Sequence, residues 1–277
     1  MTPDTPPYDE TLQQLADERP RLAAILQTAE NRRARQAAAL RRGKRLHGVD
    51  ELLTRLDGLA ETFRSDPNLA KLTFLIRRCI ADFESAAETT LSGYIALAHD
   101  AMRDVMEIEY LIRDFVHHPD NIDAWLTADD RTLRREFSAV RVRERLHAAQ
   151  DPSFKTSAES MDYRGHSQSL HVRPRSIFLP QNGYLDPKHD PGGFGSDSGY
   201  WEIFEHARRL LDALCSLTGK LAPGSAADRL ANEGTPAVKE AWQRTQQTQT
   251  VFMALIEAAS ETQRNSVDGD QPKLSVT

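Results

Sequence analysis

Apolar residues recur along most of this chain with the period of an α-helix. Between residues 52 and 63, for example, Leu52, Leu56, Leu59 and Phe63 follow one another at intervals of three or four residues, which places them on one helical face. The strict alternation of apolar and polar residues that marks a half-buried strand is almost absent. The pattern therefore predicts an all-α protein built as a helical bundle.

The first part of the chain is predicted to form an amphipathic helical hairpin at residues 8–65, after a disordered leader at residues 1–7. Pro20 suits the first turn of a helix, where its missing N–H costs nothing, and this helix should end near Gly43. A second helix opens at about Gly48 and carries the apolar stripe that ends at Phe63. We interpret this hairpin as a surface for a protein partner.

A long central helix is predicted next, because Ser65-Asp66-Pro67 is a strong start signal and no further proline occurs before Pro119. The stretch from Thr89 to Gly93 is weakly helical, so a kink or break is expected there. Apolar residues lie on more than one side of this segment, which is typical of a helix at the centre of a bundle.

The remaining elements complete a bundle that spans residues 66–221. We expect a short helical turn at 121–127, a helix from Asp129 or Asp130 to about Ala149, a helix at 157–171 and another at 200–221. Residues 172–199 are rich in proline and glycine and should form a long loop insertion. A C-terminal helix at 222–264 and a disordered tail at 265–277 follow.

The charge of the chain is balanced overall but unevenly placed. Lys and Arg number 35 and Asp and Glu 41, which argues against a dedicated binder of double-stranded DNA. Residues 31–47 nevertheless hold seven basic residues and no acid, and residues 131–147 hold six Arg and two Glu. A solvated helix face, a nucleic-acid backbone and an acidic protein partner all fit such runs. If the second run binds RNA, the expected contacts are Arg134, Arg135, Arg141, Arg143 and Arg145.

Several functional classes lack support in the sequence. No nucleotide-binding glycine motif, nucleophile elbow, CxxC or HExxH is present. Two carboxylate-x-x-His pairs, Asp114/His117 and Glu144/His147, have the spacing of di-metal ligands, but no set of inward Glu residues accompanies them, and we expect neither a metal nor another cofactor. No apolar run is long enough to span a membrane. We expect a soluble cytoplasmic protein whose two cysteines are reduced.

One constellation suits phosphodiester chemistry. In Tyr163-Arg164-Gly165-His166-Ser167-Gln168-Ser169-Leu170-His171, Arg164 and His171 lie seven residues apart, on one face if the segment is helical. Histidine can move a proton to or from the reacting oxygens, and a guanidinium can stabilise charge on the phosphate. Similar Arg–His spacings occur from Arg41 and Arg42 to His47, from Arg113 to His118 and from Arg141 to His147. We favour Arg164/His171 because its neighbours are small and polar.

An Arg followed after four to six residues by a His, behind long helices, resembles the HEPN superfamily of RNases found in toxin–antitoxin and phage-defence systems. The resemblance covers about residues 67–221. It implies a metal-independent endoribonuclease with Arg164 and His171 as catalytic residues, oriented by Glu107 or Glu109. It also implies a homodimer whose two Arg/His pairs face one groove and cut single-stranded RNA. The alternative is a helical bundle without catalysis, which acts as a regulatory or protein-interaction module.

Overall fold

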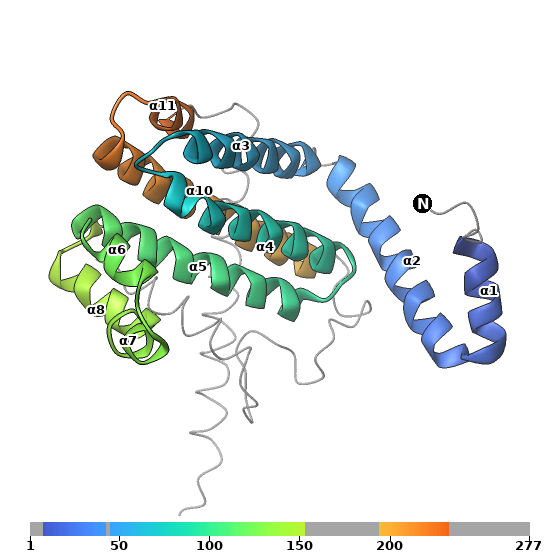
Figure 1. The fold of residues 1–277 in the computed structure, drawn as a ribbon. Coiled ribbons are helices and arrows are strands. Elements are labelled where there is room, and N and C mark those ends of the chain that lie inside the picture. The colour runs from blue at the N-terminus through green and yellow to red at the C-terminus, as the bar shows by residue number, and fades with distance from the viewer. Residues whose placement is uncertain (1–7, 43–44, 153–193, 233–277) are drawn as a thin grey trace, which may run out of the picture.

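The computed structural model describes residues 8–42, 45–152 and 194–232, and every regular element in these ranges is helical (Figure 1). The all-α prediction is confirmed for this part of the chain. The elements are α1 (Tyr8–Glu18), α2 (Pro20–Arg42), α3 (Arg45–Ser65), the 3-10 turn η1 (Ala70–Leu72), α4 (Thr73–Leu91), α5 (Ile95–His117), α6 (Asn121–Leu126), α7 (Asp130–Glu136), α8 (Ala139–Ala148), α10 (Phe194–Leu221) and α11 (Ala226–Asn232).

Helix α5 lies at the centre of the bundle, as its broad apolar surface predicts. It packs against α4, α8 and α10, while α3 lies on α4 and α11 packs against both α3 and α10 (Figure 1). Its buried apolar side chains meet those of the neighbouring helices in one continuous core. The largest side chains in this core are fully buried: Phe63, Phe83, Tyr110, Phe115 and Phe204.

The predicted break in the long central helix is confirmed. Helix α4 ends at Leu91 and α5 begins at Ile95. Gly93 has a φ of +82°, and the backbone N–H groups of Gly93 and Tyr94 donate to the carbonyl oxygens of Thr90 and Thr89. This is the pattern of a Schellman C-cap, which needs a left-handed residue that glycine supplies without steric cost.

Two boundaries differ from the sequence-based expectation. The helix expected from residue 130 to 149 is interrupted, because Ser138 adopts an extended conformation with φ −62° and ψ 150°, and Phe137 packs against the core. Helix α10 begins at Phe194, six residues inside the predicted 172–199 loop. Glycines near its start, Gly195 and Gly199, favoured a loop, but a glycine costs only about 1 kcal/mol at an interior helix position, so it does not exclude a helix.

Helix α3, which precedes residue 65, shares its core with the helices that follow. The apolar stripe of α3 is buried in the same core as α4, α5 and α10, and Gly58 lies close to Leu230 of α11. Among the described helices, α1 and α2 project from the bundle as a hairpin (Figure 1). Of the C-terminal helix predicted at 222–264, the described part holds a turn and then α11 (Ala226–Asn232). The rest of that prediction, the predictions for residues 1–7, 157–171 and 265–277, and most of the 172–199 loop lie outside the described residues.

Candidate functional site

The predicted catalytic residues Arg164 and His171 lie outside the described residues, in the segment that joins α8 to α10. The flanks of this segment are described. At one end Asp151 follows α8 and is buried, and at the other end Phe194 opens α10. The described parts of the candidate site are therefore the helices on either side of this segment, α8 and α10, and the helix α5 that packs against both.

The predicted RNA-binding residues lie on α7 and α8, the last described helices before that segment. Arg134, Arg135 and Arg141 are exposed. Two open surface depressions, of about 480 and 420 Å³, run over this corner and share Arg135 in their linings. Each exposed arginine has one acidic neighbour within the same helix or turn: Arg134 with Asp130, Arg135 with Glu136 and Arg141 with Glu144.

Arg145 has a different environment from its basic neighbours. Its Nε and Nη2 donate to the two carboxylate oxygens of the buried Asp114 at 2.8 and 2.7 Å. Its Nη1 donates to the carbonyl oxygen of Glu136, and its guanidinium lies 5.4 Å from the centre of the Phe137 ring. Arg145 therefore joins α8 to α5 through Asp114. Its sequence position had instead predicted a contact with RNA. Arg143 is half-buried.

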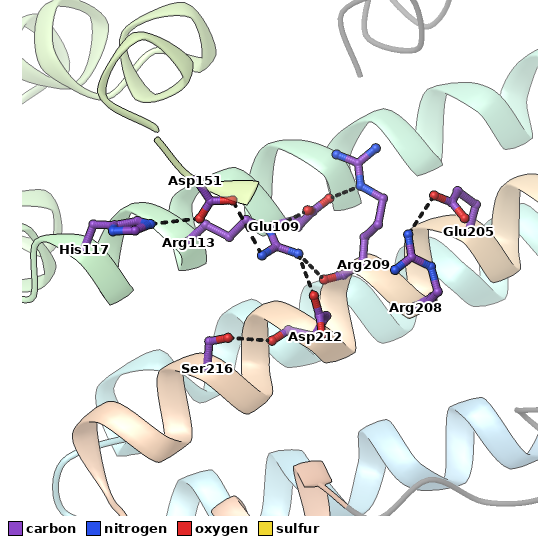
Figure 2. A network of polar contacts seen from close by, with 9 residues as sticks. All are labelled: Glu109, Arg113, His117, Asp151, Glu205, Arg208, Arg209, Asp212 and Ser216. Carbon is purple, nitrogen blue, oxygen red and sulfur yellow. Dashed lines mark hydrogen bonds and ion pairs between the residues drawn. The ribbon is translucent and has the colours of Figure 1, made fainter. Parts of the chain in front are cut away.

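A seam of buried charged residues lies between α5 and α10 (Figure 2). Glu109, which is fully buried, accepts from Nε of Arg113 at 2.8 Å and lies 2.9 Å from Nε of Arg209. Arg113 also donates to the carbonyl oxygen of Arg209 and to Asp212, at 3.2 and 3.4 Å. The Glu109 carboxylate thus offsets the positive charge of two buried guanidinium groups. One of these groups belongs to α5 and the other to α10, so the carboxylate links the two helices.

The seam continues to the start of the undescribed segment. Nε2 of His117 and Oδ2 of Asp151 are 2.8 Å apart, and Nη1 of Arg113 lies 4.0 Å from Oδ1 of the same carboxylate (Figure 2). Asp151 is buried, whereas the His117 side chain keeps 30% of its surface exposed. Asp151 therefore anchors the chain at the C-terminal end of α5, directly before the segment that carries Arg164 and His171.

The other end of the seam holds two imidazoles and a carboxylate. Nδ1 of His99 lies 3.6 Å from Glu202, and Nε2 of His206 lies 3.2 Å from the same side chain. All three are buried. Since His99 faces Glu202 and Glu109 faces Arg209, α5 and α10 run in the same direction.

Glu107 and Glu109, the two carboxylates predicted to orient the catalytic pair, lie in different environments. Glu107 is half-exposed and pairs with Arg103 one turn earlier, at 3.2 Å. Glu109 is held inside the seam. The orienting role of Glu107 stays a prediction. The Glu109 carboxylate is paired with the guanidinium groups of Arg113 and Arg209.

The seam has a signal in the sequence that did not enter the predicted site. Glu109 and Arg113 fall at positions where the helical period of α5 expects core residues, and Glu202, His206 and Arg209 do the same in α10. Charged residues at core positions of two helices indicate that these helices pair. The helical period of a single sequence, however, does not identify the helix against which a buried face packs.

The two carboxylate-x-x-His pairs do not converge on a metal site. Asp114 is paired with Arg145 and also accepts from Asn121, and His117 pairs with Asp151. Within the described ranges, no group of three or more His, Cys, Asp or Glu side chains is arranged to hold a metal ion.

A pair of carboxyl groups joins α4 to α5 beside the core. Asp104 of α5 forms a two-point ion pair with Arg78 of α4. Partial burial of Asp82, together with its hydrogen bond to Asp104 and the charge of that group, raises the pKa of Asp82 to about 7. The folded protein therefore holds a proton here that the unfolded chain releases near its ordinary pKa of 3.8.

This proton makes stability depend on pH. Because the folded pKa of Asp82 is raised, the free energy of unfolding should fall as pH rises from about 4 to about 7. We expect Asp82→Asn to stabilise the protein at pH 8 by about 1 kcal/mol, a figure reduced for solvent screening of a half-exposed carboxyl. Urea denaturation at pH 5 and pH 8 measures the effect. The exposed Asp123→Asn control should show no such gain, and an equal effect of Asp82→Asn at both pH values would refute this assignment.

Comparison with models of known protein families, with curated proteins and with solved structures finds no match. The helices of the described ranges include none with the length and apolar character needed to cross a membrane.

Proposed function

We propose that this protein is a HEPN-like, metal-independent endoribonuclease of the cytoplasm that cuts single-stranded RNA in a toxin or phage-defence role. The observation that carries the proposal is the exposed basic surface of α7 and α8. Arg134, Arg135 and Arg141 present their guanidinium groups over two adjoining depressions, and this surface directly precedes the segment that holds Arg164 and His171. Both cysteines are free thiols, which fits a reducing compartment.

The proposed chemistry needs no metal. One imidazole takes the proton of a 2′-hydroxyl group, and the freed oxygen attacks the adjacent phosphorus to form a 2′,3′-cyclic phosphate. The Arg164 guanidinium stabilises the negative charge that builds on the phosphate oxygens. In the homodimer that the resemblance implies, His171 of one copy acts as the base, and His171 of the other protonates the leaving 5′ oxygen.

Removing the exposed arginines should weaken RNA binding through lost phosphate contacts. For the triple variant Arg134→Ala, Arg135→Ala and Arg141→Ala we expect an affinity for single-stranded RNA lower by about 10- to 100-fold. The slope of log affinity against log salt should decrease by about 2, since each contact to a single strand contributes about 0.7. Fluorescence anisotropy with a labelled oligonucleotide over a salt series measures both quantities.

Arg64→Ala is the matched control, because Arg64 is an exposed arginine at the end of α3 with an acidic neighbour in its own helix. It should leave both the affinity and the salt slope unchanged. Equal binding by the triple variant and the wild type would remove the α7–α8 surface from the proposal.

A second candidate function is a non-catalytic protein-interaction module, and the α1–α2 hairpin favours it. Leu22, Ile25 and Leu26 are each 44–55% exposed on α2. Incubation of the purified full-length protein with single-stranded RNA in EDTA separates the two candidates. Cleavage supports the endoribonuclease, whereas an intact substrate supports the interaction module.

A further inference from the structure

A histidine and an aspartate form a dyad where α5 and α8 end. Nε2 of His117, the last residue of α5, lies 2.8 Å from Oδ2 of Asp151 (Figure 2). The Asp151 side chain is only 7% exposed, whereas the imidazole keeps 30% of its surface open to solvent. A buried carboxylate behind an accessible imidazole is the arrangement that orients a histidine for proton transfer. The dyad therefore has the geometry of an acid–base site.

Side-chain and backbone contacts hold the Asp151 carboxylate in place. Nη1 of Arg113 lies 4.0 Å from its second oxygen, Oδ1, and Arg113 is itself bound by Glu109. The backbone N–H of Asp151 donates to the carbonyl oxygen of Leu146, and Gln150 adopts a φ of +55°. Within the described ranges, Gln150 is the one residue other than glycine with a left-handed backbone, a conformation that persists only where the surrounding structure enforces it. The imidazole therefore meets a preorganised partner.

This geometry assigns the protons of the dyad. An ionised carboxylate only accepts hydrogen bonds, so the proton of the neutral imidazole lies on Nε2 and Nδ1 keeps a lone pair. The hydrogen bond to Asp151 is the one that His117 makes with a side chain of the described ranges. A neutral imidazole held by a carboxylate in this way can act as a general base.

The dyad lies at the edge of the basic surface of α7 and α8. The second depression, of about 420 Å³, is lined by Arg145 and Ala148 among others. Arg145 binds Asp114, which lies one turn before His117 on α5, at a spacing of about 5–6 Å between Cβ atoms. Ala148 lies three residues before Asp151. Each member of the dyad is thus close to the depression over which we propose that RNA binds.

We infer that His117 is the general base of the proposed RNA cleavage and that Asp151 positions it. Nδ1 takes the proton of the 2′-hydroxyl group, the freed oxygen attacks the phosphorus, and the bond from phosphorus to the 5′ oxygen breaks. His171 remains the acid that protonates this leaving oxygen, so the base need not come from a second copy. The inference rests on the proposed function and adds residues outside its Arg164/His171 pair.

Removal of the imidazole tests this role in the full-length protein. For His117→Ala we expect the cleavage rate on single-stranded RNA in EDTA to fall about 100-fold. The affinity for a 2′-O-methyl RNA, which has no attacking hydroxyl, should stay within about twofold of the wild type, because the arginines of the basic surface are intact. Added imidazole should restore part of the rate, since the site is open to solvent.

His118→Ala is the matched control. His118 is the next residue along the chain and is exposed, and its ring centre lies 6.4 Å from that of His117. No carboxylate of the described ranges pairs with it. We expect His118→Ala to cleave at the rate of the wild type, with or without added imidazole.

Asp151→Asn tests the positioning role. The asparagine amide can donate to Nε2, which moves the imidazole proton to Nδ1 and removes the lone pair that acts as the base. We expect a rate about 100-fold lower and a changed pH dependence of cleavage, whereas a merely structural role would leave the pH dependence unchanged. The charged groups around the dyad are Arg113, Asp114 and His118 of α5 and Asp212 of α10.

The outcomes separate this inference from the proposed function. An RNA that the wild type leaves uncut would overturn both. Cleavage by the wild type that persists undiminished in His117→Ala, or that falls equally in His118→Ala, would overturn the role of His117 alone. A rate lost in His117→Ala only in proportion to lost folded protein, measured by circular dichroism, would also overturn it.

Discussion

Glu109→Ala is expected to lower the free energy of unfolding by about 3–5 kcal/mol, because it leaves two buried arginines without their shared carboxylate. Arg113 and Arg209 are only 6% and 7% exposed, so water cannot replace the lost partner. A loss of this size is a large part of the stability of a typical domain. Urea denaturation followed by circular dichroism measures it.

Glu107→Ala is the matched control for this prediction. Glu107 lies on the same helix and also pairs with an arginine one turn away, but its side chain is 39% exposed. Exposed pairs of this kind contribute about 0.3–0.5 kcal/mol. If the two variants lost similar amounts of stability, the seam would not be the charged centre of the α5–α10 interface.

Replacing either predicted catalytic residue is expected to abolish most RNA cleavage. For Arg164→Ala and for His171→Ala we expect the cleavage rate to fall at least about 100-fold, in the range for loss of a general acid–base group or of transition-state charge stabilisation. The rate is measured on single-stranded RNA in EDTA. Undiminished cleavage by both variants would assign the catalytic role to other residues.

Glu107→Ala adds a positioning test to these two variants. If Glu107 orients His171 or Arg164, its loss should reduce the rate about tenfold and shift the pH dependence of cleavage, since it changes the environment of an imidazole. Its stability should stay close to that of the wild type. A rate and pH profile equal to those of the wild type would leave Glu107 as a surface residue paired with Arg103.

Local signals in the sequence identified most helices of the described ranges. The start of α2 at Pro20, the buried stripe of α3 and the break at Gly93 all follow from the chemistry of a few neighbouring residues. The interruption at Ser138 did not follow, because the neighbouring Phe137 packs against the core formed by other helices. The early start of α10 did not follow either, because the glycines at its start favour a loop. A helical period shows which face of a helix is buried and leaves open what that face touches.

The candidate site shows the same limit. Six arginines between residues 131 and 147 look alike in the sequence, yet Arg145 joins Asp114 across 31 positions of the chain while Arg134 faces solvent. The difference arises from the fold around each guanidinium. The charges of Glu109, Arg113 and Arg209 were visible, but their pairing required the parallel packing of α5 and α10.

The chemical ends of the cleavage products distinguish attack by the 2′-hydroxyl group of the RNA from attack by water. A labelled single-stranded RNA and a matched oligonucleotide without 2′-hydroxyl groups are incubated with the wild-type protein in EDTA, and the products are identified by mass. We expect that only the RNA is cut and that its fragments end in a 2′,3′-cyclic phosphate, because the attacking oxygen belongs to the substrate. An uncut RNA, or cleavage of both oligonucleotides, would contradict it.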